Sequence, residues 1–209
     1  MTKQEASQTV AELKREFHSM MNGTASGSMR EKGLNYTVNF GVEGVRLSEM
    51  AKTLSSDGEL AAELWRQRVR ECRLLATMVQ PAADFAPDLC DEWIDSLKTT
   101  EEAQYLSLHL LSQLSYAETK ALEWTAAENE LRQLCGLLTI GRLLRGGTRF
   151  YARARNELLD QCEAALYSKN GVVARAALNA LQSFAAQNSY QEKEVERIFS
   201  NFASRNNKP

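Results

Sequence analysis

Apolar residues recur three or four positions apart in almost every segment from Leu47 to the end of the chain. This spacing matches the 3.6-residue turn of an α-helix and predicts a series of amphipathic helices. Helix-breaking residues are scarce, since the 209 residues include only three prolines and eleven glycines. A sheet-rich fold with many tight turns would need more of both. The sequence therefore predicts an all-α fold.

The predicted helices follow one another in pairs joined by short turns, with a period of roughly 40 residues. Two stretches are weakly alike: Leu64-Trp65 leads into RECRLLATMV, and Glu123-Trp124 leads into ELRQLCGLLTI. Repeated helix pairs that stack on their neighbours are typical of HEAT-type proteins. We expect a HEAT-like repeat α-solenoid (the ARM/HEAT superhelix) that forms a single domain over residues 1–209.

The first 45 residues differ from the helix pairs that we expect over 46–209. The segment TVAELKREFHSMM predicts one helix, and NGTASGS after it predicts an exposed loop of small residues. Apolar residues alternate only in NYTVNFGVEGVRL, as they would in a strand. A lone strand has no pairing partner. We therefore expect an N-terminal helix followed by an extended loop, whose aromatic side chains dock on neighbouring helices.

The cysteines and histidines do not form a metal-binding pattern. The four cysteines are widely spaced without a CxxC pair, and the chain has only two histidines. A zinc framework needs closely spaced pairs of such ligands. We therefore expect no zinc site, and we expect all four thiols to be buried in apolar helical surroundings. The cysteines are Cys72, Cys90, Cys135 and Cys162.

The N-terminal stretch MTKQEASQTV lacks the apolar core of a secretory signal. No stretch approaches the run of about 18 apolar residues that spans a bilayer. We therefore expect a cytoplasmic protein with no membrane partner.

Charge is unevenly distributed along the chain, although the formal net charge is only −2. Residues 81–102 contain seven acids and one lysine, whereas residues 131–155 contain six arginines and no acid. We call these six the arginine stripe: Arg132, Arg142, Arg145, Arg149, Arg153 and Arg155.

The arginine stripe runs from one predicted helix end, through Gly146-Gly147, into the first turns of the next helix. Arginines together with the free backbone amides of a helix start can bind phosphate groups. Tyr151 and Phe150 lie among them and could rest on a sugar or a base. The alternative is a solvated basic face, on which Arg149 and Arg153 form ion pairs with Glu157 along the helix.

A second basic cluster, Arg66, Arg68, Arg70 and Arg73, is offset by Glu63 and Glu71. For this cluster we expect a role in structural support.

The stretch MREKGLNYTVNFGVEGVRLSEMAK, followed by LAAELWRQRVRECRLLATMVQP, resembles the bacterial DNA alkylation repair family, the HEAT-like alkylpurine DNA glycosylases. The resemblance is strongest over residues 28–81 and extends over most of the chain. The matching elements are Phe40-Gly41-Val42, Arg46-Leu47, Leu64-Trp65, and Glu71 through Arg73 to Ala76.

The resemblance implies a protein that holds duplex DNA and excises cationic methylated purines, with tryptophans around the lesion and an aspartate near the sugar. Because the cationic base is already a good leaving group, a carboxylate that stabilises the developing oxocarbenium suffices, without a cofactor.

The chain departs from the family pattern at the pocket. Lys98 aligns with the first tryptophan, Glu102 with the aspartate, Asn179 with the second tryptophan and Leu134 with the pocket arginine. Thr99 to Glu102 also has the form of a capping box, which would commit the Glu102 side chain to a helix start. We expect a weakened or lost glycosylase pocket.

These patterns lead to one expected function and two alternatives. We expect a monomeric DNA-binding protein of the DNA alkylation repair family that contacts the phosphate backbone through the arginine stripe. The enzymatic alternative is an active alkylpurine glycosylase with Glu102 as its catalytic carboxylate. The third reading is a protein–protein scaffold, in which the acidic segment 84–102 attracts a basic peptide partner.

Overall fold

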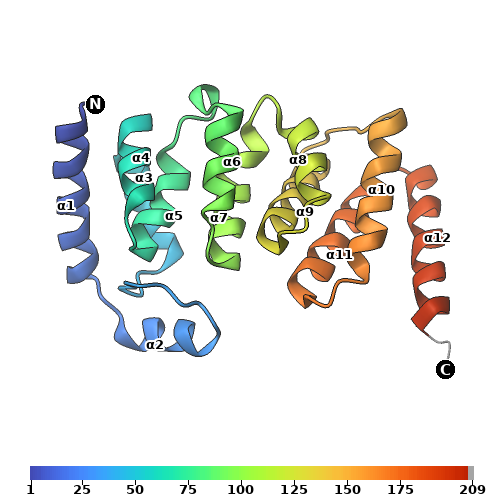
Figure 1. Cartoon of the computed structure of the whole chain (residues 1–209), viewed down its shortest axis with the longest axis horizontal. Coiled ribbons are helices and arrows are strands. Elements are labelled where there is room, and N and C mark those ends of the chain that lie inside the picture. Colours follow the sequence, from blue (N-terminus) through green and yellow to red (C-terminus); the bar gives the residue numbers. More distant parts are fainter. Residues whose placement is uncertain (207–209) are drawn as a thin grey trace. The chain divides into compact units, whose positions relative to one another are not determined.

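The computed structural model describes residues 1–206, which form twelve α-helices, two short 3-10 helices and no strand (Figure 1). The predicted all-α fold is confirmed. Within these residues no helix is both long enough and apolar enough to cross a membrane. The α-helices are α1 (Lys3–Ser19), α2 (Gly23–Glu31), α3 (Gly44–Thr53), α4 (Gly58–Arg66), α5 (Arg70–Val79), α6 (Pro87–Asp95), α7 (Thr100–His109), α8 (Ala117–Thr125), α9 (Glu130–Arg145), α10 (Ala152–Leu166), α11 (Gly171–Ala185) and α12 (Ser189–Asn206).

The chain divides into two compact units, unit 1 (residues 1–114) and unit 2 (from residue 115 on). In unit 1, α4 packs against α1 and α5, and α5 packs against α3 and α7. In unit 2, α9 packs against α8 and α11, and α11 packs against α10 and α12. Each unit therefore has an apolar core of its own. That the two belong to a single domain stays a prediction.

Four helix pairs are joined internally by loops of three or four residues: α4–α5, α6–α7, α8–α9 and α10–α11. Their first helices begin at Gly58, Pro87, Ala117 and Ala152, which gives spacings of 29, 30 and 35 residues. The predicted period of roughly 40 residues was too long, because helices α4 to α8 have only nine or ten residues each. The two stretches that are weakly alike form the pairs α4–α5 and α8–α9.

The loop predicted at NGTASGS is wrong, because residues 23–31 form helix α2. The side chain of Asn22 caps this helix by accepting a hydrogen bond from the amide of Ala25 at 2.9 Å. Asparagine at an N-cap satisfies a helix start whose first turn consists of small residues, so capping outweighs the weak helix propensity of glycine and serine there.

The extended loop predicted before α3 is confirmed. Residues 34–43 form no strand, and a single isolated bridge joins Val38 to Val69 in the described chain. Phe40 docks on α1, where its ring centroid lies 6.3 Å from that of Phe17 and 6.1 Å from that of His18.

A buried carboxylate holds this loop in place. Glu71, on α5, is fully buried and accepts hydrogen bonds from the amides of Phe40 and Val42, both at 3.2 Å. Gly41 lies between them with a φ of 73°, and a Cβ atom at this position would collide with the backbone of Asn22. Glycine is therefore required at Gly41 for both its left-handed conformation and its lack of a side chain.

Replacing Gly41 by alanine should lower the free energy of unfolding by about 2 kcal/mol or more, because the strained φ and the collision both act against the folded state. Chemical unfolding followed by circular dichroism would measure this loss. Gly27→Ala is a matched control, since Gly27 lies on α2 with open space around it. Alanine there should leave stability unchanged or raise it by up to about 1 kcal/mol.

All four cysteines are free and buried, as predicted. Burial raises the pKa of both Cys72 and Cys162 to about 12. The folded state therefore keeps these protons at a pH where unfolded thiols, with a pKa near 8.5, have lost theirs. Because the unfolded state then binds fewer protons, stability should fall as the pH rises above about 8.5.

We expect a thiol reagent at pH 8 to label the native protein at least about a hundred times more slowly than the unfolded protein, since the thiolate is the reactive species. Time-resolved absorbance with a chromogenic disulfide reagent would measure both rates. A cysteine that reacts at once in native buffer would contradict the burial of these thiols.

Candidate functional site

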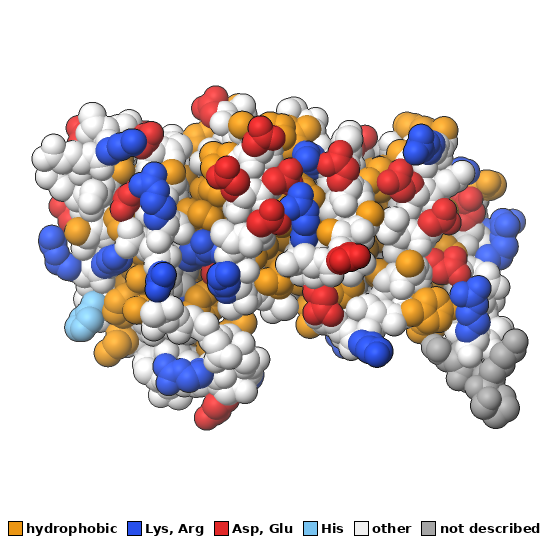
Figure 2. Space-filling model, in the orientation of Figure 1, with side chains coloured by type: hydrophobic (Ala, Val, Ile, Leu, Met, Phe, Trp, Pro, Cys, Tyr) orange, Lys and Arg blue, Asp and Glu red, His pale blue; other side chains and the backbone are white. Residues whose placement is uncertain are grey.

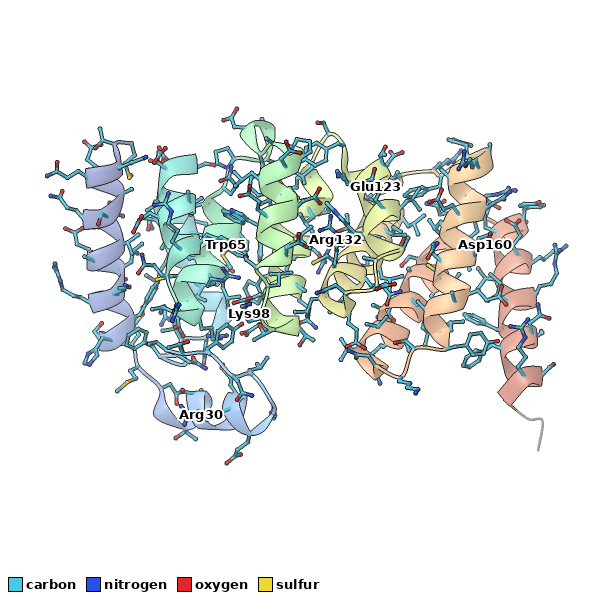
Figure 3. All side chains as sticks on the ribbon, viewed as in Figure 1. Arg30, Trp65, Lys98, Glu123, Arg132 and Asp160 are labelled. Atoms are coloured by element: carbon cyan, nitrogen blue, oxygen red, sulfur yellow. The ribbon has the colours of Figure 1, made fainter. Side chains whose placement is uncertain are left out.

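Unit 1 contains a cavity of about 890 Å³ bordered by α4, α6 and the extended loop. Two stacked tryptophans line it, Trp65 from α4 and Trp93 from α6, with ring centroids 4.1 Å apart and ring planes within 3°. Phe85 meets Trp93 edge-on at 4.9 Å. Figure 3 shows Trp65 and Lys98 on the same side of unit 1, and both residues line the cavity.

The second face of Trp65 is covered by Arg73. The guanidinium carbon lies 3.6 Å from the ring centroid, so Trp65 is held between this cation and Trp93. The same guanidinium donates to the backbone oxygens of Trp65 and Ser96, both at 3.1 Å. Because protein groups occupy both faces of Trp65, the ring has no free face on which a nucleic acid base could stack.

Glu102 is bound on both of its carboxylate oxygens. Arg73 donates through Nε and Nη2 to the two oxygens, each at 3.1 Å, and the amide of Lys98 donates to Oε2 at 2.8 Å. Thr99 caps α7 as predicted, accepting from the amide of Glu102 at 3.2 Å. The Glu102 side chain thus returns to the amide of Lys98, one residue before the amide expected for a capping box. These bonds give Glu102 a structural function, and its catalytic role stays a prediction.

The cluster of four arginines around α5 divides into two classes. Arg70 and Arg73 are ion-paired within the protein, as expected for structural support. Arg66 is largely exposed and pairs with Glu63 at 2.6 Å. Arg68 is exposed and lines the cavity, and within the described residues no hydrogen bond or ion pair engages its side chain. The sequence pattern did not separate Arg68 from Arg70 and Arg73, which differ from it in burial, or from Arg66, which differs from it in ion pairing.

Lys98, which aligns with a family tryptophan, is also exposed at the cavity. Its ammonium group has no hydrogen-bond or ion-pair partner in residues 1–206. In the view of Figure 2, the basic side chains of unit 1 gather mainly on the lower half of this face, below the acidic side chains around α6. The cavity is therefore lined by aromatic rings, by the unpaired cations Arg68 and Lys98, and by the exposed carboxylate of Glu92.

The arginine stripe lies in unit 2, at the end of α9 and the start of α10. Helix α9 ends at the predicted Gly146-Gly147 turn, where Gly147 has a φ of 91°. Gln187 fixes the loop that follows, donating to the backbone oxygens of Leu144 at 3.1 Å and of Thr148 at 2.7 Å. Phe150 anchors the loop, since its side chain is only 3% exposed.

Three arginines of the stripe are exposed: Arg145, Arg149 and Arg153. Arg145 donates to the hydroxyl of Ser183 at 3.3 Å. Neither Arg149 nor Arg153 forms an ion pair within residues 1–206, so the predicted alternative in which they pair with Glu157 is not present there.

The other three arginines of the stripe are half-buried. Burial, and to a smaller extent the nearby charge of Arg145, lowers the pKa of Arg142. Arg155 lies 3.9 Å from Glu194 and 5.7 Å above the ring of Tyr190. Arg132 already has interaction partners in the protein. The structure therefore leaves Arg145, Arg149 and Arg153 as the most accessible cations of the stripe.

No three histidine, cysteine, aspartate or glutamate side chains of residues 1–206 are grouped closely enough to hold a metal ion.

The family model described as DNA alkylation repair enzyme matches residues 13–197. The chain belongs to this family. A solved structure reported as "a new family of proteins related to the HEAT-like repeat DNA glycosylases with affinity for branched DNA structures" is similar to the chain. Its TM-score is 0.78 at 19% sequence identity, and the match covers 90% of this chain and 80% of that one. No curated protein sequence matches.

The match of residues 13–197 confirms the family predicted from the Phe-Gly-Val, Leu-Trp and Glu-x-Arg elements. The structural likeness confirms the predicted HEAT-like repeat fold.

Replacing Glu102 by glutamine should lower the free energy of unfolding by about 1–3 kcal/mol, because Arg73 would lose its buried counter-ion while the side-chain shape is kept. Chemical unfolding would measure this change. Glu92→Gln is the control, since Glu92 lines the same cavity but is exposed. It should shift stability by less than about 0.5 kcal/mol. Equal stability of the two variants would mean that the Arg73–Glu102 pair does not support the fold.

Proposed function

We propose that the protein binds DNA through phosphate contacts made by the arginine stripe, chiefly Arg145, Arg149 and Arg153, and that its unit 1 cavity does not excise bases. The observation that carries this proposal is the exposure of Arg149 and Arg153 at the start of α10 without a carboxylate partner in the described chain. Solvated basic faces usually neutralise such charges along the helix, and this one does not.

The electrostatics of α10 support a negatively charged ligand. The N-terminus of a helix carries partial positive charge, so acidic residues are favoured in its first turn and basic ones are unfavourable. Helix α10 has no acid in its first turn and no side-chain cap at Tyr151, while Arg153 and Arg155 follow directly. This arrangement costs local stability in the free protein. A phosphate group would bind the exposed arginines and the free amides together.

The unit 1 cavity is poorly suited to a cationic methylated purine. Its buried carboxylate, Glu102, is neutralised by Arg73, and Lys98 adds an unpaired positive charge. Like charges repel most strongly at short range in a partly desolvated cavity. The carboxylate that aligns with the family's aspartate is therefore not free, and the ring of Trp65 has no open face for a base, although the exposed Glu92 also lines the cavity.

The comparisons support DNA as the partner. The matching family model is described as DNA alkylation repair enzyme. The similar solved structure comes from proteins with affinity for branched DNA. We propose a monomer acting in the cytoplasm, as expected from the sequence.

Duplex affinity should fall steeply with salt, because each phosphate contact releases a condensed counter-ion. The double variant Arg149→Ala/Arg153→Ala should weaken binding and reduce the slope of log K against log salt by roughly 2 units, about 0.9 for each lost contact. Fluorescence anisotropy over a salt series would give both values. Arg15→Ala/Arg46→Ala removes the same charge from two exposed arginines of unit 1, and it should leave the slope nearly unchanged.

Two outcomes would overturn the proposal. Absence of duplex binding by the wild-type protein at about 50 mM salt would favour the scaffold alternative, since backbone contacts are strongest at low salt. Release of 3-methyladenine from methylated DNA, abolished by Glu102→Gln in a protein that stays folded, would establish the glycosylase alternative.

A further inference from the structure

Tyr151 is a large aromatic side chain displayed to solvent in the middle of the arginine stripe. It is 68% exposed, whereas the preceding Phe150 is 3% exposed, and Arg149 and Arg153 on either side are exposed as well. Burial therefore alternates along the loop, which directs Arg149 and Tyr151 outward together while Phe150 anchors the backbone.

The fold makes no evident use of the Tyr151 ring. Two other exposed tyrosines have ring partners: Tyr167 lies 4.9 Å from Phe202, and Tyr190 lies under the guanidinium of Arg155 at 5.7 Å. Within residues 1–206 the Tyr151 ring has no aromatic or cationic partner, and its hydroxyl makes no hydrogen bond. A lone exposed aromatic side chain is ordinary by itself. Tyr151 differs in lying between two exposed arginines that have no ion-pair partner in the described chain.

The backbone that carries Tyr151 is held firmly. Gln187 binds the backbone oxygen of Thr148 at 2.7 Å, and Phe150 is packed into unit 2. Tyr151 itself has extended backbone angles, φ −121° and ψ 155°, immediately before α10. A ring on a fixed backbone loses little conformational entropy on binding, which favours its use as a contact residue.

We infer that Tyr151 stacks on an unpaired DNA base, while Arg149 and Arg153 bind the phosphates that flank it. The inference rests on the proposed DNA-binding function and adds a selectivity for unpaired bases over continuous duplex. In a continuous duplex both faces of each internal base are covered by its neighbours. An unpaired base offers a free face, and aromatic side chains bind such faces with little regard to sequence.

The test compares two labelled DNAs of equal length and charge, a continuous duplex and the same duplex in which about five consecutive base pairs are replaced by unpaired thymines on both strands. Tyr151→Ala should weaken binding to the interrupted DNA about tenfold and to the duplex less than about twofold, since only the first DNA loses a stacking contact. Tyr151→Phe keeps the ring and should retain the wild-type preference. Tyr167→Ala removes an exposed tyrosine of the same unit whose ring pairs with Phe202 and with no arginine of the stripe, and it should leave the preference unchanged.

A fluorescent 2-aminopurine placed among the unpaired bases provides a direct readout of stacking. The wild-type protein and Tyr151→Phe should change its emission on binding, and Tyr151→Ala should not. If Tyr151→Ala binds both DNAs with wild-type affinity, or loses affinity equally for both, the inference is overturned while DNA binding by the arginines stands. If the wild-type protein binds neither DNA at low salt, the proposed function itself fails.

Discussion

Two adjacent ion pairs made by α5 are the interaction on which unit 1 depends. Arg70 binds both oxygens of Glu101, at 2.6 and 2.8 Å, and Arg73 binds both oxygens of Glu102. Each pair joins α5 to the first turn of α7, about 30 residues away in sequence, and both arginines are largely withdrawn from water. Buried charges are tolerated only when they are paired and hydrogen-bonded. The paired acids are therefore tied to α5.

The ion pairs made by α5 also limit the chemistry that is available in the cavity of unit 1. Glu102, which the sequence resemblance aligns with the family's aspartate, is bound on both oxygens by Arg73 and the amide of Lys98. A carboxylate that stabilises the fold in this way is not available for a developing positive charge in a substrate. The two faces of the Trp65 ring are likewise covered by Arg73 and Trp93. Both contacts support the proposal that this cavity does not excise bases.

Unit 2 shows the opposite arrangement at the junction of α9 and α10. Arg149 and Arg153 remain exposed without an acidic partner in the described chain, at a helix start that disfavours positive charge. The loop that carries them is nonetheless well held, by Gln187 and by the buried Phe150. Positive charge at this helix start lowers local stability, yet the loop that carries it is firmly held. Such departures from the most stable arrangement are expected at functional sites, which supports the proposed phosphate contacts.

The sequence alone determined the helical class, the family and the positions of the short motifs, because periodicity and caps act over a few residues. The loop predicted from the sequence at α2 was wrong, because the cap formed by Asn22 stabilises a helix there in spite of the low helix propensity of glycine. The sequence also did not separate Arg68 from Arg70 and Arg73, which share one cluster but differ in burial. Only the tertiary structure decided which arginines are neutralised and which carboxylates are free, because ion pairing depends on distances between helices that lie far apart in the chain.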